Sequence, residues 1–132
     1  AYRRELFESP NIRAIGFLDV DAPAFREAQE RAGWLLLPSC AEAQCGAITV
    51  GLSLGIPCAG SAACDIDDPE VIRLPGTDLP TLGAMVDDLA RRGAAEVRAR
   101  SEASLALARR AYARRDYARS IRAALDAALG DA

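Results

Sequence analysis

Residues 34–65 read WLLLPSCAEAQCGAITVGLSLGIPCAGSAACD, a short apolar run, a longer apolar segment and a second short run. Trp34–Leu37 is apolar at every position, which is typical of a parallel strand covered by helices on both faces. Ala43–Leu54 is apolar nearly all round and predicts a buried helix. Ile56–Ala59 predicts the next strand. A strand, a helix and a strand in succession predict a βαβ unit and therefore a parallel sheet.

Further segments extend this alternation along the chain. Ile12–Leu18 and Val71–Leu74 are apolar runs bounded by turn residues, and both predict strands. Helical periodicity occurs in four more segments, Ala24–Ala32, Leu79–Arg91, Ala94–Ala113 and Tyr117–Leu129. The fold class that we expect is α/β, a short parallel sheet of about four strands with helices on both faces.

The composition excludes several classes of chemistry. The chain has 132 residues, enough for one domain, and it contains no histidine and no lysine. Without histidine there is no Ser-His-Asp or Cys-His nucleophilic site and no His-ligated zinc. Without lysine there is neither a P-loop lysine nor a Schiff-base enzyme. The 16 basic residues are all arginines, and 19 acidic residues bring the net charge to −3, which argues against nucleic acid as a partner.

The cysteines are better explained as thiols than as metal ligands. Cys40, Cys45, Cys58 and Cys64 fall near the carboxyl ends of predicted strands, but their spacing without histidine is poor for zinc. We therefore expect reduced thiols, no metal and a cytoplasmic protein, because no apolar run is long enough to span a membrane and nothing marks secretion. The acidic residues at 65–70 lack the ligand order of a calcium loop and predict a solvated turn.

The candidate site residues lie between Pro38 and Gly46. This segment follows the carboxyl end of a predicted strand, where open α/β sheets bind their ligands, and it leads into a helix. A helix start offers free N–H groups to phosphate or sugar oxygens, and small residues there let a ligand approach the backbone. Ser39 and Glu42 also fit the capping box S-x-x-E, which needs no ligand. Both interpretations stay open on the sequence pattern.

An ordered set of motifs adds to this interpretation: Pro38-Ser39, Glu42-Ala43-Gln44, Gly46 and Gly55-Ile56-Pro57-Cys58. The set resembles the carboxyl-terminal domain of the group 1 glycosyltransferases of GT-B fold. Members of that family have a strand, then Pro-Ser, then Glu-Gly-aromatic-Gly opening a helix, then Gly-x-Pro-Val on the next strand. Asn11–Phe17 is similar to the family's strand that ends in Phe-x-Gly. Tyr112–Tyr117 is similar to the stretch before its last helix, so the resemblance covers nearly the whole chain.

This resemblance implies the donor-binding part of a retaining glycosyltransferase, a transferase that takes a nucleotide sugar as its donor substrate and needs neither a cofactor nor a metal. Residues 1–132 would be a partial Rossmann-like, nucleotide-sugar-binding domain, with the C-terminal helices at 94–129 packing on it. Glu42 would be the catalytic residue, which meets the donor sugar. The implied donor-binding residues are Ser39, Ala43, Gln44, Cys45 and Gly46 around the helix start, and Gly16 and Phe17 near the base.

The chain departs from the family pattern at several points. Val50 stands where the family has a second Glu that holds the ribose, Ala43 replaces a Gly, and Cys45 stands where Gly is common. No segment matches the family's first strands with their basic pair, or its N-terminal acceptor domain. The resemblance therefore implies a domain truncated at its N-terminal side, inactive alone and part of a longer enzyme that is cytoplasmic or peripherally associated with a membrane. The sugar, the base and the acceptor stay open.

A different class fits the same departures, a non-catalytic α/β interaction module. Tyr117, Ile121, Leu125 and Leu129 recur at a spacing of four and predict an amphipathic helix through which such a module would dock on a partner. Under either interpretation, truncating a doubly wound domain exposes a sheet edge and apolar helix faces. We therefore also expect self-association of the chain.

Overall fold

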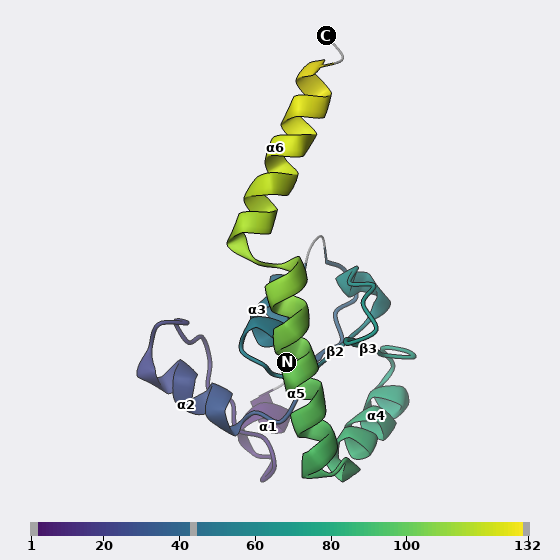
Figure 1. The fold of residues 1–132 in the computed structure, drawn as a ribbon. Helices are drawn as coiled ribbons and strands as arrows, with labels where there is room; N and C mark the ends of the chain where they lie inside the picture. Colours follow the sequence, from purple (N-terminus) through teal and green to yellow (C-terminus); the bar gives the residue numbers. More distant parts are fainter. Residues whose placement is uncertain (1–2, 43–44, 131–132) are drawn as a thin grey trace. The chain divides into compact units, whose positions relative to one another are not determined.

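The computed structural model describes residues 3–42 and 45–130 (Figure 1). The chain divides into two compact units, the first ending at Arg31 and the second beginning at Ala32, and each is described by itself. In the first unit, α1 spans Arg3–Phe7 and α2 spans Pro23–Arg31, close to the helix expected at 24–32. Among the described residues, no helix combines the length and the apolar character that crossing a membrane requires.

The strand predicted at Ile12–Leu18 is not formed, so this prediction is wrong. Residues 12–19 have no regular secondary structure, and Gly16 has a φ of 67°, which interrupts an extended chain. The apolar side chains of Ile12, Ile15 and Phe17 are exposed. A strand is stable when a neighbouring strand satisfies its backbone N–H and C=O groups, and the described sheet pairs no strand with this segment.

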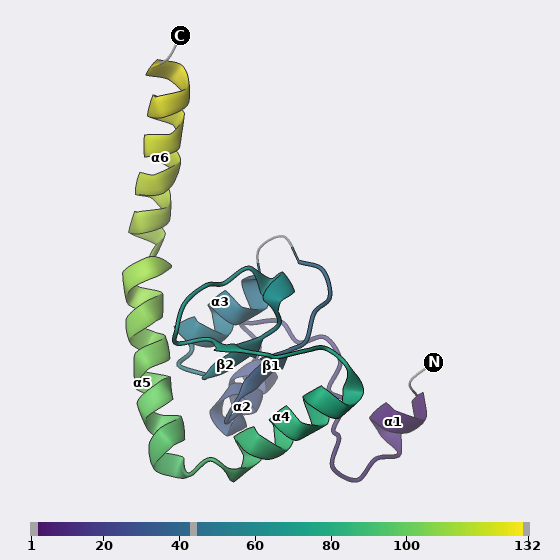
Figure 2. The same ribbon diagram turned by 90° about the vertical axis from the view of Figure 1, so that its right-hand side faces the viewer.

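A parallel sheet in the order β1-β2-β3 forms the centre of the second unit. Figure 2 shows β1 beside β2, and Figure 1 shows β3 beside β2. β1 spans Leu35–Leu37, β2 spans Cys58–Gly60 and β3 spans Ile72–Arg73. Leu37 is in register with Gly60, and Gly60 is in register with Arg73. The α/β class and the parallel sheet are confirmed. Within the described ranges the sheet has three strands rather than about four, because the run at 12–18 contributes none.

Helices cover both faces of this sheet (Figure 2). α3 (Gly46–Ser53) and α5 (Ala94–Ala111) pack on one face, and α4 (Leu79–Arg91) packs on the other. The side chains of β1 alternate accordingly: Leu35 and Leu37 pack under α3, and Leu36 packs towards α4. The observed α4 has the bounds expected from its periodicity. Its N-cap is Asp78, whose Oδ1 accepts a hydrogen bond from the Thr81 N–H at 3.0 Å.

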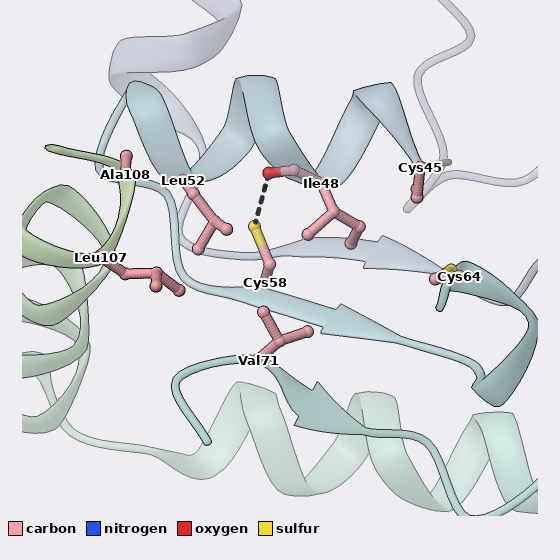
Figure 3. Close-up of a cluster of buried hydrophobic side chains, with 8 residues drawn as sticks. All are labelled: Cys45, Ile48, Leu52, Cys58, Cys64, Val71, Leu107 and Ala108. Atoms are coloured by element: carbon pink, nitrogen blue, oxygen red, sulfur yellow. Dashed lines mark hydrogen bonds between the residues drawn. The ribbon is translucent and has the colours of Figure 1, made fainter. Parts of the chain in front are cut away.

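The main core lies between the sheet, α3 and α5 (Figure 3). Its buried members are Cys45, Ile48, Leu52, Cys58, Cys64, Val71, Leu107 and Ala108. Cys58 has no exposed surface, and its Sγ donates to the Ile56 carbonyl oxygen at 3.1 Å and lies 3.8 Å from that of Ile48. On the opposite face, Ala59, Leu74 and Leu89 form a smaller cluster. Small and branched apolar side chains therefore fill the space between the sheet and the helices of the second unit.

The two C-terminal helices differ in their packing. Of the helices expected to pack on the domain, α5 does so through Leu107 and Ala108, which lie against the α3 side of the core. α6 spans Arg114–Gly130, longer than the expected 117–129, and its described side chains are all exposed. The amphipathic stripe predicted for this segment lies on α6, and its side chains Tyr117, Ile121, Leu125 and Leu129 are all exposed.

Gly51 is the tightest glycine position in the core. A Cβ on Gly51 would lie 2.8 Å from the Cys58 Sγ and 3.2 Å from the Leu35 Cδ1, both below ordinary contact distance. We expect Gly51→Ala to lower the free energy of unfolding by about 1–3 kcal/mol, because overpacking outweighs the better helix propensity of alanine. Urea denaturation monitored by circular dichroism measures this change.

Gly83→Ala is the matched control, since Gly83 lies inside α4 and a Cβ there meets nothing within 4 Å. This change should raise the free energy of unfolding by about 0.5–1 kcal/mol. In addition, Cys58→Ala should relieve part of the Gly51→Ala penalty in the double variant. Equal effects of the two glycine changes would contradict the close approach of α3 to the sheet.

Candidate functional site

The three strands end at one edge of the sheet, and a hollow of about 300 Å³ lies there. Its lining residues come from the loop after each strand: Ser39 and Cys40 after β1, Ser61, Ala62 and Ala63 after β2, and Leu74, Pro75, Gly76 and Thr77 after β3. Among the described residues, the lining contains hydroxyl groups and small side chains and no charged side chain. This carboxyl edge of the sheet is the place where open α/β folds bind ligands.

Hydrogen bonds tie the first two loops together. Ser61 is buried, and its Oγ donates to the carbonyl oxygen of Ser39. The Cys64 thiol lies 3.6 Å from the carbonyl oxygen of Leu37, the last residue of β1. Ser61 is the N-cap of the short 3₁₀ helix η1 (Ala62–Cys64) and Cys64 is its last residue, so this turn is held against the end of β1. The loops after β1 and β2, which both line the hollow, are therefore joined by these contacts.

Glu42 is joined to this hollow through Ser39. The Ser39 Oγ donates to the Glu42 Oε1 at 2.8 Å, and it lies 3.3 Å from the carbonyl oxygen of Ala41. The Glu42 side chain is exposed, and Ser39 is half-buried. An exposed carboxylate held by a neighbouring hydroxyl can accept hydrogen bonds from the hydroxyl groups of a sugar.

The S-x-x-E pattern does not cap a helix. α3 begins at Gly46 rather than at 43, and Ser39 and Glu42 bond to each other in the loop before it. The N-cap residue is Cys45, whose side chain makes no capping hydrogen bond, and a Cβ on Gly46 would meet nothing within 4 Å. The start of α3 therefore offers backbone N–H groups beside open space, which suits an anionic oxygen.

The remaining predicted site residues fall into three groups. Ala43 and Gln44 lie outside the described residues. Gly16 and Phe17 belong to the first unit, where Phe17 is 96% exposed. Cys45 is 1% exposed, so its side chain belongs to the core and only its backbone is available to a ligand. The structure thus brings Ser39 and Glu42 together and sets Gly46 at the helix start that follows them.

Sequence reasoning missed Ser61 and Thr77, both of which line the hollow. Each follows a predicted strand by a few residues, and the carboxyl ends of parallel strands share one edge. The same rule that singled out Ser39 would have found them. Val50, which stands at the position of the family's second Glu, is 42% exposed on α3 and is not among the residues that line this hollow; together with Gly46 it lines a second hollow beside α6.

Three of the four cysteines form part of the core. In the described part of the chain, no group of three His, Cys, Asp or Glu side chains is arranged to hold a metal ion. Cys45, Cys58 and Cys64 are buried free thiols, and Cys40 is exposed. Burial raises the pKa of Cys58 to about 12, and it also raises the pKa of Cys45, which lies beside Cys64. In the turn at 65–70, Asp68 pairs with Arg110 at 3.6 Å.

Comparisons of the chain with protein-family models, with curated proteins and with solved structures each found no match. The resemblance to glycosyltransferase domains therefore rests on short motifs alone. The site is described from the residues of this chain only.

The burial of three thiols predicts selective labelling. In the native chain at neutral pH, a maleimide should modify Cys40 rapidly and leave Cys45, Cys58 and Cys64 unmodified, because those side chains are buried and the raised pKa of Cys58 keeps its thiol protonated. In denaturant all of them should react. Mass spectrometry of peptides from a timed reaction measures both; equal labelling of Cys40 and Cys58 in the native chain would contradict the packing.

The raised pKa of Cys58 also predicts alkaline destabilisation. An unfolded thiol with its ordinary pKa of 9.0 loses its proton above that pH, whereas the native thiol keeps it up to about 12. The native state then binds more protons than the unfolded state, so its stability falls as pH rises from 9 towards 12, by at most about 1.4 kcal/mol per pH unit for one group.

Cys58→Ala should therefore flatten the decline of the unfolding free energy between pH 9 and 11, measured by denaturant titration at each pH. Part of the slope should survive in this variant, because burial also raises the pKa values of Cys45 and Tyr112. Gly83→Ala is the control and should leave the slope unchanged, since it removes no titratable group. If the slope is the same in Cys58→Ala as in the unchanged chain, the raised pKa of Cys58 does not contribute to the alkaline destabilisation.

Proposed function

We propose that this chain is the donor-binding part of a retaining glycosyltransferase of GT-B type, and that it binds a nucleotide sugar at the carboxyl edge of its sheet. The observation that carries the proposal is the hydrogen bond between Ser39 and Glu42 at the hollow where β1, β2 and β3 end. The ordered motifs between Pro38 and Cys58 support it independently of the geometry.

In this proposal the hollow takes the uncharged part of the donor. Its lining has the hydroxyls of Ser39, Ser61 and Thr77 and no charged side chain, which suits the hydroxyl groups of a sugar. Glu42, held by Ser39 at 2.8 Å, orients the sugar by accepting hydrogen bonds from its hydroxyls. A carboxylate in a fixed position stabilises the positive charge that develops on the sugar when its bond to the phosphate breaks.

The start of α3 takes the diphosphate. The N–H groups of Gly46 and Ala47 receive no capping bond from the Cys45 side chain, and open space lies beside Gly46. A positive helix end there stabilises the charge of the leaving nucleoside diphosphate without a metal ion. Catalysis also needs an acceptor-binding domain, so we expect residues 1–132 to bind the donor without transferring the sugar.

The second candidate function is a non-catalytic α/β interaction module. The observation that favours it is the exposure of the amphipathic α6, on which Tyr117, Ile121 and Leu125 contact no core cluster of the described chain. Val50, in place of a ribose-binding Glu, fits this candidate as well. It predicts association through α6 and no binding of nucleotides.

Calorimetric titration distinguishes the two candidates. The chain is titrated with UDP-, GDP- and ADP-glucose and with the corresponding nucleoside diphosphates. We expect one base to be preferred. We expect Glu42→Ala to weaken the affinity for the sugar nucleotide about tenfold more than the affinity for the diphosphate, because the Glu42 carboxylate accepts hydrogen bonds from the sugar, which the diphosphate lacks.

Glu102→Ala is the matched control, since Glu102 is an exposed carboxylate on α5. It should leave both affinities unchanged. If Glu42→Ala weakens the sugar nucleotide and the diphosphate equally, Glu42 does not meet the sugar. If no nucleotide or nucleotide sugar binds, the donor-binding proposal fails and the interaction module takes its place.

A further inference from the structure

Ser61 directs its hydroxyl group to a neighbouring loop rather than to the helix that it caps. It is the N-cap residue of η1, and it is 5% exposed. The hydroxyl of an N-cap serine ordinarily accepts a hydrogen bond from a backbone N–H in the first turn of its own helix. The Ser61 side chain makes no such bond, and its Oγ donates to the carbonyl oxygen of Ser39 in the loop after β1. The hydroxyl proton of Ser61 is therefore committed to Ser39 and is not available to a bound ligand.

This hydrogen bond is the first of two that lead from β2 to Glu42. Ser61 holds the backbone of Ser39 through the carbonyl oxygen, and the Ser39 Oγ donates to the Glu42 Oε1 at 2.8 Å. Ser39 thus receives a hydrogen bond at its backbone and gives one from its side chain. The three residues form a continuous path from the loop after β2, through the loop after β1, to an exposed carboxylate.

The segment at the end of β1 is held at two points by the turn after β2. The Ser61 N–H donates to the Leu37 carbonyl oxygen at 3.2 Å, and the Cys64 Sγ lies 3.6 Å from the same oxygen. The Ser61 hydroxyl holds the second point, the carbonyl oxygen of Ser39. One contact leaves a loop free to rotate about it, whereas two contacts fix its direction. The hydroxyl bond therefore sets the direction in which the loop leaves β1.

Glu42 depends on this path for its position. It lies in a loop without regular secondary structure, and its side chain is exposed. Within the described ranges, the hydrogen bond to its carboxylate comes from Ser39. An exposed glutamate without a partner samples many rotamers, and ordering it when a ligand binds costs conformational entropy. A Ser39 that is already held in place lowers this cost.

From this path we infer that Ser61 is a positioning residue for Glu42, which it holds through Ser39 in the orientation that recognises the sugar of the donor. The inference rests on the proposed nucleotide-sugar site and adds to it a role for the loop after β2. Ser61 affects the recognition of the sugar and not that of the diphosphate, because the path ends at Glu42 and does not include Gly46 at the start of α3.

A double-mutant cycle tests this inference. The whole chain is titrated calorimetrically with the sugar nucleotide that it prefers and with the matching nucleoside diphosphate. Ser61→Ala should weaken the affinity for the sugar nucleotide about fivefold and leave the affinity for the diphosphate unchanged. In the Glu42→Ala variant, Ser61→Ala should cause no further loss, because the side chain that Ser61 positions is gone. Ser61→Thr keeps the hydroxyl group and should bind both ligands as the unchanged chain does.

Thr77→Ala is the control for the cycle, since Thr77 lines the same hollow from the loop after β3 and lies outside the path. In the proposed site its hydroxyl meets the sugar directly, so its effect on the sugar nucleotide should add to that of Glu42→Ala. Additive losses for Ser61→Ala and Glu42→Ala would overturn the inference and leave the proposed function intact. If the unchanged chain binds no sugar nucleotide, the proposed function fails, and the role of Ser61 in recognising a sugar fails with it.

A second measurement tests the positioning itself without any ligand. In ¹⁵N relaxation of the free chain, Ser61→Ala should lower the order parameters of the amides at Cys40–Glu42, and Ser61→Thr should leave them unchanged. Far-ultraviolet circular dichroism checks that both variants keep the fold. Equal order parameters in Ser61→Ala and in the unchanged chain would show that Ser61 does not position Glu42, whether or not a sugar nucleotide binds.

Discussion

Parallel pairing of β1 with β2 is the constraint on which the second unit depends. Parallel strands cannot be joined by a tight turn, so the chain between Leu37 and Cys58 must return along the sheet, and it does so through α3. The register that sets Leu37 beside Gly60 brings the loops after both strands to one edge. The bond from the Ser61 hydroxyl to the Ser39 carbonyl then holds these loops together, and the hollow between them follows from the pairing.

The helix α3 packs closely on this short sheet, and small side chains at the centre of the fold allow this close approach. α3 approaches the sheet at Gly51, and Cys58 fills the space beneath it. A cysteine in this position behaves as a small apolar residue whose thiol bonds to a backbone carbonyl. Cys64 packs in a similar way, since a Cβ on Gly60 would lie 3.3 Å from its Sγ.

Much of the architecture could be predicted from local signals. The bounds of α4 follow from its periodicity and from Asp78 at its N-cap, and the β1-α3-β2 order follows from alternating apolar runs. Ile12–Leu18 could not be predicted correctly, because an apolar run becomes a strand only where another strand accepts its hydrogen bonds. Packing on a partner element is a property of the folded chain, and a single segment does not encode it.

The site shows the same division between local and tertiary information. The residues Ser39 and Glu42 were identifiable from their place after a strand, but their spacing is equally that of a capping box. Only the structure shows that the two side chains bond to each other in the loop and that α3 begins at Gly46. Ser61 reaches the hollow through the pairing of β2 with β1, and its place just after a predicted strand is the local signal that could have identified it.

The central claim, that the carboxyl edge of the sheet binds a nucleotide sugar, is tested most directly by heteronuclear NMR of the ¹⁵N-labelled chain during titration with UDP-, GDP- and ADP-glucose. The account predicts that one of these donors shifts the amide resonances of Ser39–Glu42, Gly46–Ile48, Ser61 and Thr77, and leaves those of residues 122–130 in α6 unchanged. Titrations that shift none of these resonances, or that shift only residues elsewhere in the chain, would contradict it.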